Sequence, residues 1–289
     1  MFRNLKEKFQ VGVPAEEGDV MKLRVLIDNY TYIDEYYLGE PAASFYIEEG
    51  GQRILFDCGY SDVLLRNAQL MDIDFTNLNR IVFSHGHNDH TRGLLFLKDE
   101  VDLSHVVTLA HPDCFLPRKD ETGSFGAPFT VEEASSWTAL SLSQEPQYLT
   151  DKLVWLGEIP RNNDFEGAEP IGRRLKDGLW EADYVIDDTA LAYCGEEGLF
   201  IITGCSHSGI CNIIEYAKEV CGDMRISGVL GGFHLFEEGS RLEKTIAYLQ
   251  SCEMQKLYPC HCVSLKAKAA MLAKLPVVEV GVGLELEIK

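Results

Sequence analysis

SHGHNDH, residues 84–90, is the most informative stretch of this chain, and it directly follows the apolar run RIVF at residues 80–83. Three imidazoles and one carboxylate fall within six residues, at His85, His87, Asp89 and His90. In an extended chain His85 and His87 point to the same side, and a following turn can aim the other two at a neighbouring position. Neutral imidazole and carboxylate are ligands for Zn, Mn or Fe(II). The stretch predicts a metal site at the end of a buried strand, with a solvated histidine-rich loop as the alternative.

The bulk composition is that of a soluble globular protein. The chain has 289 residues, of which 46% are hydrophobic and 25% charged, and one domain with a substantial core is expected. No apolar run reaches the roughly 18 residues of a membrane span. Residues 1–20 carry charges throughout and lack the apolar segment of a secretory signal, so we expect an N-terminal extension there. Nine cysteines without a signal favour a reducing, cytoplasmic location.

The formal net charge of −20 restricts the partners. So acidic a surface repels phosphate backbones, which argues against nucleic-acid binding. A small anionic substrate stays possible, because a local cationic site can overcome the global field. The sequence leaves the oligomeric state open.

The order of the predicted elements indicates the fold class. We expect strands at 22–28, 44–48, 53–57, 80–84, 106–110, 189–193, 199–203, 226–230, 256–258 and 277–280, and helices starting near Ser61 and spanning about 210–220, 242–249 and 265–275. Two packed sheets with helices outside fit this pattern, so residues 21–289 are predicted to form a single four-layer αββα sandwich. Residues 112–187 are rich in proline and less regular, which favours a lid or specificity insertion.

Five short motifs carry a resemblance to a known family. HGHNDH resembles the HxHxDH signature of the metallo-β-lactamase superfamily, and ILFDCG, residues 54–59, resembles its strand–Asp–x–Gly motif. Three further segments, TGCSHSG (203–209), LGGFHL (230–235) and YPCHC (258–262), are similar to the family typified by 7,8-dihydropterin-6-methyl-4-(β-D-ribofuranosyl)aminobenzene-5′-phosphate synthase. The similarity runs from about Lys22 to the C-terminus.

The resemblance implies a binuclear metal site. His207 and His261 match the family's remaining ligand positions, so His85, His87 and His207 are expected to hold one metal, and Asp89, His90 and His261 the other. The expected cofactor is two divalent ions, Zn first, with Mn or Fe as alternatives. Taken alone, His207 or His261 is more often a structural histidine than a ligand.

Further roles follow from the same resemblance. Asp57 is expected to orient a ligand histidine, against the alternative of a turn or capping aspartate. Asp89 and His234 are the catalytic candidates, with a structural histidine as the alternative for His234. Cys205 stands where the superfamily has an aspartate shared by both metals, so the site either lacks that bridge or uses a thiolate. A buried inert cysteine is the favoured reading of Cys205.

The resemblance and the helix start after residue 209 suggest how a phosphate is held. Ser206, Ser208 and Gly209 precede a helix, whose free N–H groups favour anions, and Arg161 lies in the irregular segment. We therefore expect a metal-dependent hydrolase or transferase of a small phosphorylated substrate, a pterin diphosphate in the family's own case. The alternatives are a lactone or thioester hydrolase of the same fold and a non-catalytic, metal-dependent ligand sensor.

Overall fold

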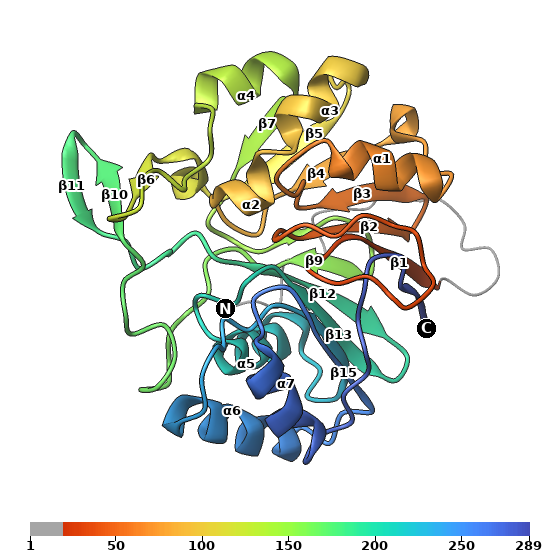
Figure 1. The fold of residues 1–289 in the computed structure, drawn as a ribbon, viewed down its shortest axis with the longest axis vertical. Coiled ribbons are helices and arrows are strands. Elements are labelled where there is room, and N and C mark those ends of the chain that lie inside the picture. Colours follow the sequence, from red (N-terminus) through yellow and green to blue (C-terminus); the bar gives the residue numbers. More distant parts are fainter. Residues whose placement is uncertain (1–19) are drawn as a thin grey trace.

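A computed structural model describes residues 20–289, so the predicted extension lies, except for Val20, outside the described residues. Two sheets pack face to face, with helices on both outer faces (Figure 1). The first sheet has seven strands, in the order β16 (Glu285–Ile288), β1 (Met21–Ile27), β2 (Ser44–Glu49), β3 (Gln52–Phe56), β4 (Arg80–Val82), β5 (Val107–Ala110) and β7 (Ala139–Leu142). The second has six, in the order β15 (Lys256–Pro259), β14 (Ile226–Gly231), β13 (Gly198–Thr203), β12 (Ala190–Gly195), β9 (Leu153–Trp155) and β8 (Gln147–Tyr148).

Helices cover the outer face of each sheet. The first sheet carries α1 (Val63–Leu70), α3 (Leu94–Glu100) and α4 (Val131–Trp137), and the second carries α5 (Ile210–Cys221), α6 (Ser240–Ser251) and α7 (Leu265–Leu272) (Figure 1). Two 3-10 turns, η1 (Phe75–Asn77) and η2 (Pro112–Phe115), complete the first half. Apolar side chains fill three layers: one between the sheets and one under each set of helices. This is the predicted αββα sandwich.

Parallel pairing in both sheets positions the site. Strands β3, β4 and β5 are parallel in the first sheet, and β13, β14 and β15 are parallel in the second. Buried on both faces, these strands read as continuous apolar runs. The carboxyl ends of parallel strands meet at one edge of a sheet, where α/β folds bind ligands. The predicted motifs all follow these strand ends.

Two expectations about the elements were wrong. Residues 277–280 form only an isolated bridge, between Val277 and Leu257, and the last strand is β16. The alternating burial of β16 suits an edge strand on β1, whereas Pro276 removes an N–H just before 277. The expected insertion at 112–187 is not one unit, because β7, β8 and β9 pair within the two main sheets.

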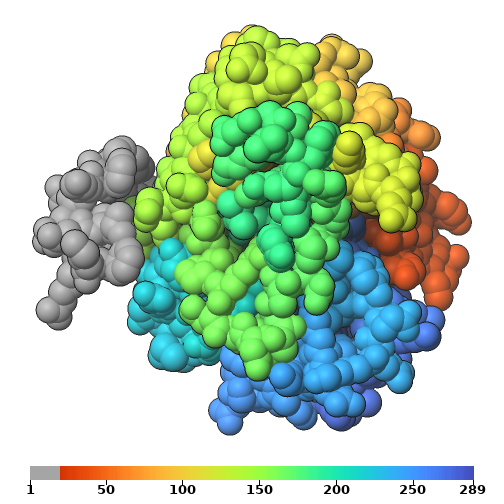
Figure 2. All heavy atoms as spheres, turned by 90° about the vertical axis from the view of Figure 1, so that its left-hand side faces the viewer, coloured from red at the N-terminus to blue at the C-terminus, as the bar shows by residue number. Residues whose placement is uncertain are grey.

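A smaller part of that segment does stand apart. Strands β6 (Arg118–Lys119), β10 (Arg173–Lys176) and β11 (Leu179–Ala182) form a separate three-stranded sheet, which projects from the sandwich (Figures 1 and 2). A role for this small sheet as a lid stays a prediction. No helix within residues 20–289 has the length and apolar character of a membrane span.

Candidate metal centre

Loops from both sheets bring most of the chain's imidazoles together. Six of its eight histidines lie in or beside one buried cluster: His85, His87, His90, His207, His234 and His261. The first three follow β4, and the one-turn helix α2 (Asn88–Thr91) carries Asp89 and His90. The other three follow β13, β14 and β15.

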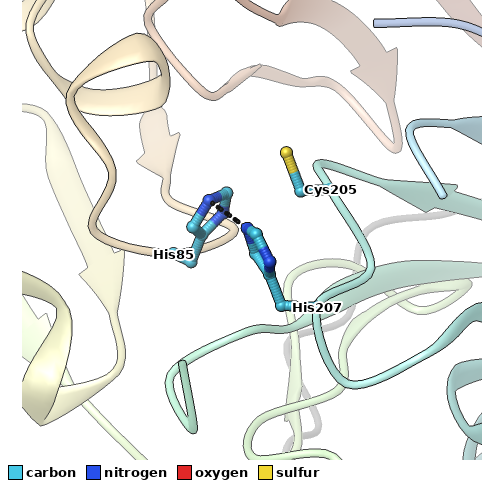
Figure 3. A group of neighbouring side chains, drawn as sticks. All are labelled: His85, Cys205 and His207. Carbon is cyan, nitrogen blue, oxygen red and sulfur yellow. Dashed lines mark hydrogen bonds between the residues drawn. The ribbon is translucent and has the colours of Figure 1, made fainter. Parts of the chain in front are cut away.

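His85, Cys205 and His207 form what we call the first ligand group. All three are buried, and their possible ligand atoms lie within 4.8 Å of one another. The Nε2 atoms of His85 and His207 face each other at 3.2 Å, and Cys205 lies beside the pair (Figure 3). The ring centroid of His87 is 4.4 Å from that of His85 and 4.7 Å from that of His207. Its buried Nε2 has no hydrogen-bond partner among the described residues.

His90, Cys205 and His261 form the second ligand group, which shares its cysteine with the first. The Nε2 atoms of His90 and His261 are 3.2 Å apart. The Oδ2 of Asp89 lies 3.4 Å from the Nε2 of His261 and 3.6 Å from that of His90. The two sets of side chains that the sequence assigned to two metals thus lie in two adjoining clusters.

Asp57 fixes the tautomers of two histidines. Its Oδ2 lies 2.7 Å from the Nδ1 of His90 and accepts a 2.7 Å hydrogen bond from the hydroxyl of Ser84. Because that hydroxyl proton is committed to Asp57, the Ser84 Oγ accepts from the Nδ1 of His85 at 2.9 Å. Both rings therefore carry their proton on Nδ1 and present a bare Nε2 to the centre, which is how metal-binding histidines are oriented.

His261 is oriented in the same way from another part of the chain. Its Nδ1 lies 3.2 Å from the amide oxygen of Asn29, which can only accept, so the ring proton sits on Nδ1. Its backbone N–H donates to Asp28 at 2.6 Å. Asp57, Ser206, His234 and His261 all have φ between 48° and 62°, a region that non-glycine residues rarely adopt. Such backbone strain concentrates at functional sites.

These residues fit a divalent metal. The Nδ1 atoms of His90 and His261 are already bonded, so their Nε2 atoms, 3.2 Å apart, can share either a metal ion or a proton. Two nitrogens on one tetrahedral zinc lie about 3.3 Å apart, which is close to both observed Nε2 separations. The unpartnered Nε2 of His87 is a further buried ligand atom with no role in the protein alone.

The two groups differ in their electrostatics. Burial and the neighbouring imidazoles hold the pKa values of His85 and His207 well below the usual value. Burial also lowers the pKa of His90, but Asp89 and Asp57 outweigh it and the net shift is upward. For His261, burial is outweighed by Cys262 and Asp89, and the pKa rises to about 9.

His234 lies at the margin of the first ligand group. Its ring centroid is 4.5 Å from that of His207, and its backbone N–H donates to the Sγ of Cys262 at 3.2 Å. Burial, followed by the charge of Arg241, lowers its pKa to about 4. It is therefore neutral near pH 7 and able to accept a proton. Its position beside the cluster is compatible with the predicted acid/base or substrate-contact role.

Arg241 was missed by the sequence reasoning. It lies in the first turn of α6, and its buried Nε has no hydrogen-bond partner among residues 20–289. A cation in the first turn of a helix opposes the helix dipole, and this was the available sequence signal. This Nε is a candidate donor to an anion, and the charge of Arg241 reaches His234, whose pKa it helps to lower.

The residues expected to hold phosphate are committed elsewhere. The hydroxyl of Ser206 donates to the carbonyl of Gly232 at 2.7 Å, and the N–H and hydroxyl of Ser208 donate to Asp188 at 2.9 and 2.5 Å. Arg161 donates to three main-chain carbonyls, those of Gly167, Tyr184 and Val185.

The start of α5 is likewise occupied. Buried Glu166 accepts from the N–H groups of Cys211 and Asn212 at 3.1–3.2 Å, and a Cβ on Gly209 would lie only 2.3 Å from its side chain. The expectation that this helix start binds an anion was wrong, because a carboxylate of the chain already fills it.

A buried arginine of the small sheet holds the loop that carries His85 and His87. Arg118, which is fully buried, donates to Asp183 at 2.8 Å and to Asp187 at 2.6 Å. Asp187 accepts from the N–H of Gly86, between His85 and His87, at 2.8 Å. A Cβ on Gly86 would lie 1.7 Å from the carbonyl oxygen of Cys114, so only glycine fits there. Asp187 therefore positions the loop through its backbone.

Known proteins share both the sequence and the fold. The sequence model of the metallo-beta-lactamase superfamily matches residues 38–231. A Methanocaldococcus jannaschii protein described as uncharacterized is 33% identical over 247 residues, 85% of this chain and 91% of that protein. The 7,8-dihydropterin-6-methyl-4-(beta-D-ribofuranosyl)-aminobenzene-5′-phosphate synthase of the same archaeon is 30% identical over 265 residues, 86% of this chain and 90% of the synthase. The crystal structure of Tm1679, a metal-dependent hydrolase of the beta-lactamase superfamily, has a TM-score of 0.80 at 27% identity, covering 93% of this chain and 99% of Tm1679.

Proposed function

This chain belongs to the metallo-β-lactamase superfamily, and we propose that it is a metal-dependent hydrolase or transferase of a small phosphorylated substrate. The observation that carries the proposal is the pair of buried ligand groups that adjoin at Cys205. The proposed ligands are His85, His87 and His207 for one metal and Asp89, His90 and His261 for the other. Imidazole and thiolate side chains favour zinc over magnesium or calcium.

When bound, two such metals supply a water of near-neutral pKa and a clamp for anionic oxygens. The protein's own residues provide orientation and proton handling. Asp57, directly and through Ser84, and Asn29 bond the Nδ1 atoms of three histidines and so turn their Nε2 atoms toward the centre. Arg118 holds the backbone between His85 and His87 through Asp187. His234 is neutral near pH 7 and lies beside the cluster, so we assign it the transfer of a proton to or from the reacting group.

The phosphorylated character of the substrate rests on two observations. The buried Nε of Arg241 has no partner among residues 20–289, the charge of Arg241 acts on His234, and guanidinium groups bind phosphate oxygens in pairs. In a chain of net charge −20, a local cation of this kind is needed to hold an anion. The archaeal relative makes a pterin-containing phosphate, and this supports a phosphorylated ring compound as the first substrate class to test.

A substrate panel tests the proposal. The metal-free protein and the protein loaded with zinc, manganese or iron(II) are assayed on a phosphodiester, a phosphomonoester, an organic diphosphate, a lactone and a thioester. We expect metal-dependent turnover of a phosphorylated member, lost in His85→Ala and kept in His105→Ala, which removes an exposed histidine outside the site. Preference for the lactone or thioester would favour the other hydrolases of this fold. Metal binding without any turnover would favour a sensor.

Arg241 is tested with the same assay. We expect Arg241→Ala to raise KM for the phosphorylated substrate by about tenfold, since a charge-assisted hydrogen bond contributes roughly 1.5–3 kcal/mol. Lys244→Ala is the matched control, because Lys244 lies three residues further along the same helix and pairs with Asp164 at the surface. An unchanged KM in Arg241→Ala would remove Arg241 from the substrate site.

A further inference from the structure

Cys205 is the residue that belongs to both ligand groups. We propose that the sulfur of Cys205 is a ligand shared by both metals and joins the two positions into one centre. This inference rests on the proposed metal-dependent function and deepens it, because it assigns the group that links the metals.

The geometry places the sulfur within reach of both positions. In each group the sulfur and the two histidine nitrogens lie within 4.8 Å of one another. The Cys205 Sγ is 3.2 Å from the Nε2 of His90, and a sulfur and a nitrogen on one tetrahedral zinc lie roughly 3.5 Å apart. Figure 3 shows Cys205 and His207 on one loop, with His85 facing them from another. The sulfur therefore has the imidazoles of both groups around it.

The local backbone holds Cys205 in this position. At the end of β13, a Cβ on Gly204 would lie 2.2 Å from the Oγ of Ser84, so this loop packs directly against the loop that carries His85. Ser206 has φ of 55°, and its hydroxyl contacts both Gly232 and Thr203. This turn directs the side chains on either side of Ser206, Cys205 and His207, into the cluster.

The proton balance of the step is simple. The Nδ1 of His90 is bonded to Asp57, so its Nε2 can accept the S–H of Cys205 in the metal-free protein. When metals bind, that proton leaves to solvent, and the sulfur uses separate lone pairs for the two ions. No group is oxidised or reduced.

Two neighbouring cysteines serve as matched controls. Cys260 and Cys262 flank His261, and neither belongs to a ligand group among the described residues. The Cys262 Sγ accepts from the N–H of His234 at 3.2 Å and lies 3.7 Å from the carbonyl oxygen of Cys205. Single substitutions of these three cysteines show which of them supplies a sulfur ligand.

The experiment is a cobalt(II) titration of the full chain, freed of metal under anaerobic, reducing conditions. Absorption is recorded in the near ultraviolet, where thiolate-to-cobalt charge transfer appears, and bound cobalt is counted by elemental analysis. For the wild type we expect two cobalt ions per chain and a charge-transfer band that grows through both additions. The band should be lost in Cys205→Ser and kept in Cys260→Ser and Cys262→Ser.

The Cys205→Asp variant separates loss of the sulfur from misfolding of the serine variant, because a carboxylate can also join two metals. It should bind two cobalt ions without the band, with an unchanged circular dichroism spectrum. The proposal is overturned if wild type binds two ions without a band, if the band survives in Cys205→Ser or Cys205→Asp, or if it is complete after the first ion. A wild type that binds no cobalt would overturn the proposed function as well, so the two failures are distinguishable.

Discussion

The first and second ligand groups have similar histidine spacing but different surroundings. In each, two Nε2 atoms face each other at 3.2 Å. In the first group, His85 is bonded to the Ser84 hydroxyl, and the Nδ1 of His207 has no hydrogen-bond partner within residues 20–289. Behind the second stand the carboxylates of Asp57 and Asp89, with Asp28 on the backbone of His261. The second position is thus an anionic site for a cation, whereas the first relies on neutral imidazoles.

This difference determines which metal position depends on contacts with residues outside its ligand group. Carboxylates in the second group attract a cation by themselves. Asp89 and Asp57 also raise the pKa of His90, and Cys262 together with Asp89 raises that of His261. The histidines of the first group are neutral, so metal affinity at this position depends on geometry and on the sulfur shared with the second group. Arg118 and Asp187 supply that geometry by fixing Gly86, between two of its histidines.

The largest effect is expected from Arg118→Ala. The change leaves Asp183 and Asp187 buried without their partner, which costs about 3–5 kcal/mol of unfolding free energy. Urea unfolding measures this loss, with Arg173→Ala, at an exposed position of the central strand of the small sheet, as the control. At urea concentrations at which Arg118→Ala stays folded, the variant should lose the metal of the first group before that of the second. Loss of both metals at the same urea concentration would show that Arg118 and Asp187 do not hold the loop of His85 and His87 specifically.

Deleting one ligand from each group comes next. His207→Ala and His261→Ala should each bind one metal instead of two, and kcat/KM should fall more than about 100-fold, since even residues behind the ligands contribute 10–100-fold. The remaining ion should be held more tightly in His207→Ala, which keeps the anionic group. Competition with a chelator ranks the affinities. Tighter binding in His261→Ala would reverse the comparison.

Asp57→Asn should act on both groups, with a smaller effect. The substitution removes the negative charge beside His90 and weakens the chain through Ser84 to His85, so metal affinity should fall about 10–100-fold. Asn29→Ala touches only His261 and should weaken only the second position, by a few-fold. Equal losses in the two variants would mean that Asp57 does not serve both groups.

The two positions should also differ in the pH dependence of their metal affinity. The pKa of His261 is raised to about 9, so below that pH a proton competes with metal at the second position. The histidines of the first group have lowered pKa values and are neutral at pH 7. Apparent metal affinity at the second position should fall by about tenfold per pH unit below pH 9, and the first should change less. In the metal-free protein the sign is opposite: the raised pKa stabilises the fold below about pH 6.5, and this is lost through pH 9. Equilibrium dialysis and thermal unfolding across this range measure both.

Much of the fold could be predicted because its strands are continuous buried runs. β4, β13 and β14 lie between parallel neighbours and were expected within a few residues of their bounds. β8 and β9 were missed, because strands of two and three residues in a proline-rich segment exist only through pairing with β12 and each other. The strand expected at 277–280 was wrong because strand formation there also depends on long-range pairing. The apolar residues of this segment pack without forming a ladder, and β16, in which polar and apolar residues alternate, pairs with β1 at the edge of the sheet.

The residues of the site also fall into those that a local sequence pattern predicts and those that only long-range contacts bring in. Histidines at strand ends carry a short-range signal, so the sequence could bring His85, His207 and His261 together. Arg118 pairs with a residue 69 positions away, and Glu166 reaches the start of α5 across 45 positions. No local sequence pattern predicts contacts over such separations. The proposed anion site failed because a buried carboxylate elsewhere in the chain had already filled the helix start.

Anomalous X-ray scattering from crystals of the zinc-loaded protein, recorded at the zinc absorption edge, tests the central claim most directly. We predict two peaks, one among His85, His87 and His207 and one among Asp89, His90 and His261, with the sulfur of Cys205 between them. A single peak, or two peaks that do not share Cys205, would contradict the account of two unlike positions joined at one cysteine.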